Sequence, residues 1–158
     1  MLQAAFAIRS SMKVIEMFAA DLTPAEYLHR PVPKANCVAW TLGHLVMATR
    51  MMSAAFGVSD LPALPEGFEK RYSQKEGAPE ASDYGETSVL IPLLTAHMEL
   101  FAKAVEMSSA EKLAGALPSP HPMFGTLEEL AAFAPLHTAI HAGQISTIRR
   151  SLGRPPMF

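Results

Sequence analysis

Residues Leu130–Arg150 read LAAFAPLHTAIHAGQISTIRR, an apolar helical pattern that carries two histidines, His137 and His141. In an α-helix, positions i and i+4 lie one above the other on one face, so both imidazoles can reach a single metal ion. Burying them without partners would cost about 1–3 kcal/mol each, and a metal ion would remove that cost by using their lone pairs. The pattern therefore predicts a long buried helix that carries part of a metal site.

A third histidine, His44, lies in another apolar run, CVAWTLGHLVMATRMM, at residues 37–52. Three- and four-residue steps place His44 on one stripe of the helix with Cys37, Trp40, Ala48 and Met51, which predicts that His44 faces the core. A site of three imidazoles leaves coordination positions for water or substrate, which is typical of a catalytic metal. The alternative is that these are core histidines bonded to backbone or carboxylates. Thr138, Ala139 and Ile140 separate the histidine pair, which excludes the H-E-x-x-H type of protease.

The size and charge of the chain limit its function. A length of 158 residues predicts one domain, spanning 1–158. Lys and Arg number 13 against 15 Asp and Glu, a net charge of -2, so neither a nucleic acid nor a membrane is an expected partner. The single cysteine excludes an intramolecular disulfide and fits a cytoplasmic location. Residues 130–148 lack charged side chains, but two His, a Gln and a Pro favour a buried helix over a membrane span.

The remaining apolar periodicity and the helix caps predict an all-α, antiparallel four-helix bundle with no convincing strand. Thr23-Pro24-Ala25-Glu26 opens a short helix, Asn36 is the expected cap of the second long helix, and Thr126-Leu127-Glu128-Glu129 is a capping box. The four long helices are expected at Leu2 to about Ala20, Cys37 to Phe56, Thr87 to Ser108, and from Thr126 through Arg150.

A long connecting loop, Val58 to Gly85, separates the second and third long helices. Its prolines and glycines make it too broken for a core element, although a short helix is plausible at Phe68 to Gln74. A loop of this length usually covers a site or makes an oligomer contact.

Three features together resemble a known family. They are the T-P-A-E helix followed by prolines, the run Ala39-Trp40-Thr41-Leu42-Gly43-His44-Leu45, and HTAIHAGQI at 137–145, which Arg-Arg and Gly-Arg-Pro-Pro follow. This pattern resembles the DinB-like superfamily of small bacterial metal-binding four-helix bundles, and it spans nearly the whole chain. Its most specific part is W-x3-H followed by H-x3-H-x-G-Q.

The resemblance implies an up-down-down-up bundle, a homodimer, and a divalent metal ion, Zn or Ni, held by His44, His137 and His141. Characterised relatives of this kind include transferases and isomerases that use mycothiol, bacillithiol or glutathione. The resemblance therefore implies a metal-dependent transferase with a small-molecule substrate, a low-molecular-weight thiol. A metal-dependent hydrolase, a non-catalytic metal-binding or stress-associated dimer, and an interaction bundle with a surface drawn from its 10 Met remain open.

Other residues have more than one interpretation each. His97 is a fourth ligand, a group that supports the ligands, or a partly exposed helix residue. Gln144 either holds a water or a neighbouring helix end, or it packs against its neighbours. Trp40 either lines a substrate pocket or belongs to the core. Cys37, at a helix start, is either a reactive thiolate or a packing residue.

Arg149 and Arg150 either meet an anionic substrate or complement the helix dipole. His29 and His121 are expected on the surface.

Overall fold

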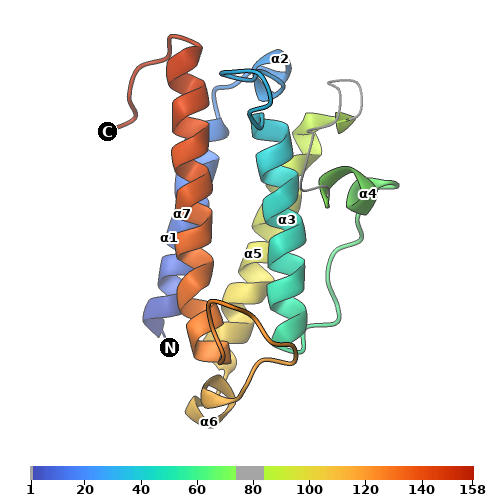
Figure 1. Cartoon of the computed structure of the whole chain (residues 1–158), viewed down its shortest axis with the longest axis vertical. Coiled ribbons are helices and arrows are strands. Elements are labelled where there is room, and N and C mark those ends of the chain that lie inside the picture. The colour runs from blue at the N-terminus through green and yellow to red at the C-terminus, as the bar shows by residue number, and fades with distance from the viewer. Residues whose placement is uncertain (1, 74–83) are drawn as a thin grey trace.

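The computed structural model describes residues 2–73 and 84–158. Four long helices, α1 (Leu2–Ala19), α3 (Val38–Ala55), α5 (Leu90–Met107) and α7 (Leu127–Ser151), form a bundle. Each helix packs against two others, and the order around the bundle is α1, α5, α3, α7. Figure 1 shows α1 and α7 running upward and α3 and α5 running downward. The predicted all-α, up-down-down-up bundle is confirmed, and the described residues contain only an isolated β-bridge, between Ala116 and Thr126.

The long connection between α3 and α5 has a topological cause. The two helices run in the same direction, so the chain must return along the bundle, a distance of about 27 Å for the 18 residues of α3. Helix α4 (Phe68–Tyr72) lies on this return path, on the side of α3 that faces away from α7 (Figure 1), and the 3-10 helix η2 (Thr87–Val89) leads into α5. The described part of the connection therefore packs on the outer side of α3.

The connection, expected to be too broken for a core element, nevertheless contributes side chains to the core. Phe68, Tyr72 and Tyr84 are each no more than 2% exposed and join the main hydrophobic cluster. Isolated aromatic residues between prolines and glycines carry no periodic signal, which is why the pattern missed them. The predicted short helix is confirmed over Phe68–Tyr72, and its expected last residue, Gln74, lies outside the described residues.

Both predicted capping boxes are present. Thr23 caps α2 (Pro24–Tyr27) together with Glu26, and Thr126 caps α7 together with Glu129. The expected cap of α3 is wrong, because Cys37 rather than Asn36 precedes the first helical residue. The Sγ atom of Cys37 accepts a hydrogen bond of 3.5 Å from the backbone N–H of Trp40. The short helix α6 (Ala110–Ala114) was not predicted, because five residues are too few to show a period.

His44 lies at the edge of the core rather than at its centre. Helix α3 buries Leu42, Leu45 and Thr49 completely, whereas His44 is half-buried and Met51, on the predicted inner stripe, is 67% exposed. Neighbouring elements cover α3 on most sides, so its apolar spacing did not identify the inner face. The predicted stripe instead borders the junction between α3 and α7, which is the least extensive of the four helix contacts.

An ion-pair network fixes the end of α7 to the end of α1. Arg149 is only 2% exposed, and its Nη1 donates to the backbone oxygen of Phe18 at 2.8 Å and to the carboxylate of Asp21. Arg154, beyond the helix, contacts the same carboxylate at 2.7 Å. The paired guanidiniums lower the pKa of Asp21, with the Arg149 hydrogen bond as the largest cause.

The variant Asp21→Asn should destabilise the fold by roughly 1–2 kcal/mol, because it leaves the buried Arg149 without its counter-charge. The cost stays moderate because the Asp21 side chain is 52% exposed and solvent screens the pair. Urea unfolding measures the change. The control Arg154→Gln removes a more exposed partner of the same carboxylate and should cost less than Asp21→Asn. Equal costs for the two variants would contradict the role assigned to buried Arg149.

One described helical segment, Thr87–Met107, is long and apolar enough by composition to cross a membrane. It consists of η2 and α5, and α5 packs against both α1 and α3. A core helix of a bundle meets the same criteria of length and composition. This segment is therefore only weak evidence for a membrane-spanning helix.

Candidate metal centre

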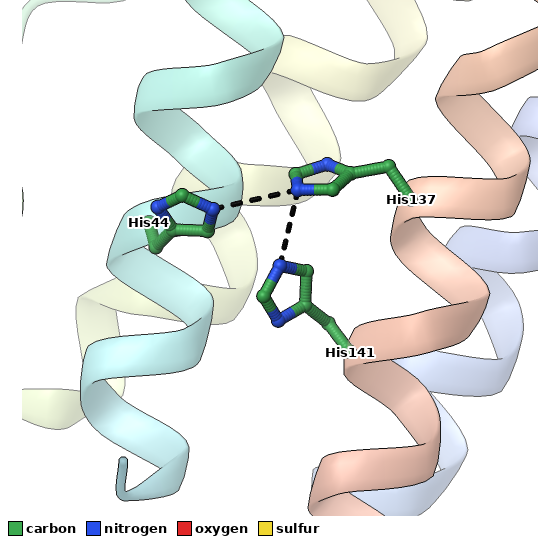
Figure 2. A group of neighbouring side chains, drawn as sticks. All are labelled: His44, His137 and His141. Carbon is green, nitrogen blue, oxygen red and sulfur yellow. Dashed lines mark hydrogen bonds between the residues drawn. The ribbon is translucent and has the colours of Figure 1, made fainter. Parts of the chain in front are cut away.

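Three histidines from two helices converge between α3 and α7. Figure 2 shows His44 on α3 facing His137 and His141 on α7. The Nε2 atom of His137 lies 3.4 Å from Nε2 of His44 and 3.1 Å from Nε2 of His141. Each side chain offers one ligand atom, and the three atoms lie within 4.8 Å of one another. The structure thus brings together the three residues that the sequence singled out.

The spacing of these nitrogens fits a divalent ion. Two imidazoles on a tetrahedral ion with metal–nitrogen distances of 2.0–2.1 Å have their nitrogens about 3.3 Å apart. Two of the three separations, 3.1 and 3.4 Å, lie on either side of that value, and the third is at most 4.8 Å. Three neutral imidazoles that meet through the same nitrogens cannot all be satisfied by mutual hydrogen bonds, because each bond needs one N–H and one lone pair. A cation would accept all three lone pairs at once.

Each imidazole is held in place by a neighbouring side chain. The indole of Trp40 stacks on His44, with ring centroids 4.9 Å apart and planes 6° apart. The ring of Phe133 stacks on His137 at 5.7 Å. Gln144 Oε1 lies 2.9 Å from Nδ1 of His141 and accepts its N–H, which leaves the lone pair on Nε2, facing the other two histidines.

These contacts revise the roles predicted for two residues. Trp40 is 8% exposed and belongs to the core, as one interpretation held, and it also orients a candidate ligand. Gln144 neither holds a neighbouring helix nor packs in the core, because it is exposed and orients His141. Sequence reasoning missed Phe133. Its position four residues before His137, one turn away on the same face, is the signal that could have found it.

Burial keeps the three imidazoles neutral. It lowers the pKa of His44 to about 4, with the nearby His141 as a smaller cause. Burial also lowers the pKa of His137 to about 4, and His141 and His44 add to the effect. The pKa of His141 is lowered by burial, while the hydrogen bond to Gln144 opposes the shift. Neutral imidazole is the form that binds metals, so the site is ready for a cation at neutral pH.

The metal-free protein should lose stability as the pH falls from about 6.5 to about 4. In this window the unfolded imidazoles take up protons that folded His44 and His137 do not, so the unfolded state binds more protons and acid favours it. Above about pH 7 both states are neutral and this contribution is constant. Urea unfolding from pH 4 to 8 measures the slope, and the double variant His44→Gln/His137→Gln should flatten it. An unchanged slope in that variant would contradict the assignment.

His97 does not belong to the site. It is fully buried, its Nδ1–H donates to the backbone oxygen of Leu93 at 2.7 Å, and its Nε2 accepts a 2.9 Å hydrogen bond from Arg50. Arg50 also donates to the backbone oxygen of Pro62 at 2.9 Å, which ties the connection after α3 to α5. His97 is therefore neither a ligand, nor a group that supports the ligands, nor a partly exposed residue. Its buried position lowers its pKa, and both nitrogens serve the fold.

The other candidate residues lie outside the cluster. Cys37 is fully buried at the start of α3, as expected of a packing residue, and it also caps the helix. Arg149 is committed to Asp21, so it does not meet a substrate. Arg150 is exposed in the last turn of α7. His121 is exposed, as expected, and the half-buried His29 lies 3.0 Å from the hydroxyl of Ser151.

Comparison with known proteins agrees with this architecture. A crystal structure of a conserved protein from Enterococcus faecalis aligns with a TM-score of 0.74, at 18% sequence identity and over 96% of each chain. At that identity the likeness shows the fold alone. No curated protein matches the chain. The family model described as the DinB superfamily matches residues 7–145, a segment that includes all three clustered histidines. On that match, and with the bundle described above, the chain belongs to the DinB superfamily.

Proposed function

We propose that this protein binds one divalent metal ion, Zn or Ni, through His44, His137 and His141. We further propose that the bound ion activates a low-molecular-weight thiol for transfer to a small electrophilic substrate. The observation that carries the proposal is the convergence of the three Nε2 atoms at separations of 3.1 and 3.4 Å, which fit adjacent ligands of a tetrahedral ion. When bound, an ion held by three neutral ligands keeps its full charge and lowers the pKa of a thiol or water beside it.

The surroundings of the cluster favour a thiol over water as the nucleophile. Within residues 2–73 and 84–158, no Asp or Glu carboxylate forms a hydrogen bond with the three imidazoles, and the side chain that accepts from His141 is the neutral amide of Gln144. A hydrolase commonly places a general base beside the attacking water. A thiol is far more acidic than water and ionises near an ion without such a base. A metal-dependent hydrolase is therefore the second candidate.

The test uses protein loaded with Zn or with Ni. Glutathione, mycothiol and bacillithiol are each mixed with 1-chloro-2,4-dinitrobenzene, and formation of the thioether is followed by absorbance. The proposal predicts a rate above that of the uncatalysed mixture, which is lost in His141→Ala. No turnover with any of the three thiols at full metal occupancy would contradict the transferase.

Cleavage of p-nitrophenyl acetate without a thiol would favour the hydrolase. Metal-dependent stabilisation without either reaction would favour a non-catalytic metal-binding or stress-associated protein.

We also propose a homodimer in the cytoplasm, with no nucleic acid or membrane as partner. The dimer is supported by Leu136 and Ile140, large apolar side chains on α7 that are 56% and 53% exposed. They are one turn apart and lie on one face of the helix, as expected for a helix-to-helix contact. Sedimentation equilibrium measures the mass. A dimer that the double variant Leu136→Lys/Ile140→Lys converts to monomer supports this contact, and a monomeric parent protein would contradict it.

A further inference from the structure

A cavity of about 360 Å³ lies at the lower end of the α3–α7 junction. Its walls come from the C-terminal part of α3, from Leu130 on α7, and from the segment between α6 and α7. Figure 1 shows that segment crossing the ends of the two helices. The volume lies within the range of small-molecule sites in proteins. No part of the candidate metal centre lines this cavity, so it is a separate feature of the fold.

The cavity lies along the same α3–α7 junction as the three histidines. Met51 lines it from α3, seven residues after His44, and Leu130 lines it from α7, seven residues before His137. The two helices run in opposite directions, so both displacements point to the same end of the bundle (Figure 1). Seven residues make nearly two full turns, so each pair lies on one face of its helix, about 10 Å apart. The cavity is thus two helical turns from the imidazoles along the same junction.

A row of aromatic side chains connects the histidine cluster with the cavity. Phe133 stacks on His137 with ring centroids 5.7 Å apart, and its ring centroid lies 5.1 Å from that of Phe124. Phe124 lines the cavity and stacks in turn on His121 at 3.8 Å. The row of rings therefore runs from a candidate metal ligand to the cavity without a polar side chain between them.

The chemistry of the lining decides what the cavity can hold. It carries no charged side chain, and its polar side chains are Ser119 and the exposed His121. Methionine, alanine, leucine, proline and phenylalanine provide the rest. Such a surface gains free energy by covering an alkyl or aryl group and offers no cation to a phosphate or carboxylate.

We propose that this cavity is the subsite for the apolar tail of the substrate, an alkyl or aryl compound whose polar head reaches the three histidines. The inference rests on the proposed metal function, because the head group is assigned to the metal. It adds the class of substrate, a molecule with a polar reactive end and an apolar part that extends about two helical turns away.

The first test measures the affinity of straight-chain hydroxamates for the Zn-loaded protein by calorimetry. The hydroxamate binds the metal, and the chain grows from acetohydroxamate to decanohydroxamate. Affinity should rise by up to about fourfold for each methylene that enters the cavity, so decanohydroxamate should bind at least tenfold more tightly than acetohydroxamate. Equal affinities along the series would overturn the proposal.

A pair of variants ties that gain to the cavity. Ala54 is an exposed residue of α3 that lines the cavity, so Ala54→Phe should fill it while leaving the core and the histidines in place. In this variant the affinity should no longer rise with the length of the hydroxamate chain, and the affinity for acetohydroxamate should be unchanged. The matched control Ala132→Phe places the same ring at an exposed position of α7 that does not line the cavity, and it should keep the gain. Retention of the full gain in Ala54→Phe would overturn the proposal.

A metal-independent probe separates failure of the cavity from failure of the metal site. N-phenyl-1-naphthylamine is uncharged and fluoresces more strongly in apolar surroundings. It should bind the metal-free protein, and Ala54→Phe should weaken this binding at least tenfold while Ala132→Phe leaves it unchanged. If the protein takes up no metal, the proposed function fails and this measurement alone decides the subsite. Equal affinity of the probe for the parent protein and for Ala54→Phe would show that the cavity does not hold apolar groups.

Discussion

Replacing His141 by alanine should reduce the affinity for Zn or Ni by more than about 100-fold, because loss of a group that merely orients a ligand already costs 10- to 100-fold. His141 is the most buried of the three histidines, and its Nε2 lies 3.1 Å from that of His137. Without it, two imidazoles remain, and water must complete the coordination. Calorimetry measures the affinity directly, and thermal unfolding gives a second measure. A metal at 100 times its Kd stabilises the parent protein by about 2.7 kcal/mol, and the variant should lose this gain.

Two matched controls sharpen this prediction. Gln144→Ala keeps all three imidazoles but removes the acceptor that holds Nδ1 of His141, so the affinity should fall by about 10- to 100-fold. His121→Ala removes an exposed histidine outside the cluster and should change nothing. Full affinity in His141→Ala, or an equal loss in His121→Ala, would show that the metal binds elsewhere.

Gly43→Ala should destabilise the protein by about 3 kcal/mol or more, although alanine is normally the better helix former by about 1 kcal/mol. A Cβ atom at Gly43 would lie 2.2–2.4 Å from three ring atoms of Tyr72. That ring cannot move aside, because it is 1% exposed and packs against Phe68 and Tyr84, with centroids 4.4 and 5.9 Å away. The added methyl group must therefore push α4 away from α3.

The control for Gly43→Ala is Gly143→Ala, in α7. A Cβ there would meet no atom within 4 Å, so this variant should stabilise the fold by about 0.5–1 kcal/mol. The same substitution is thus expected to act with opposite signs at two helical glycines. In a Tyr72→Ala background the clash disappears, and Gly43→Ala should become neutral or stabilising. Destabilisation that persists in that background would contradict the steric explanation. Urea unfolding of the parent protein, the three single variants and the double variant measures all of these changes.

The sequence predicted the fold and the histidine cluster because both depend on local signals. Apolar periodicity and the caps at Thr23 and Thr126 located the helices, and the four-residue spacing of His137 and His141 placed them on one face. His44 was harder, because α3 is apolar on nearly every side. The spacing could not show that His44 faces the junction with α7 rather than the centre of the core.

Other features depend on contacts between distant parts of the chain. The burial of Arg149 follows from Asp21, which lies 128 residues earlier and is brought close only when α1 and α7 pack together. His97 needed the position of Arg50, which lies on α3, to be recognised as structural. The cavity depends on how the segment after α6 crosses the helix ends, which no local pattern encodes.

The central claim is that the three histidines hold a metal ion, and elemental analysis of protein purified without a His tag tests it most directly. The protein is incubated with Zn or Ni and freed of excess ion, alongside His44→Ala, His137→Ala and His141→Ala. About one ion per chain in the parent protein, and far less in each variant, is the predicted result. A parent protein that takes up neither ion, or variants that keep the full content, would contradict the account.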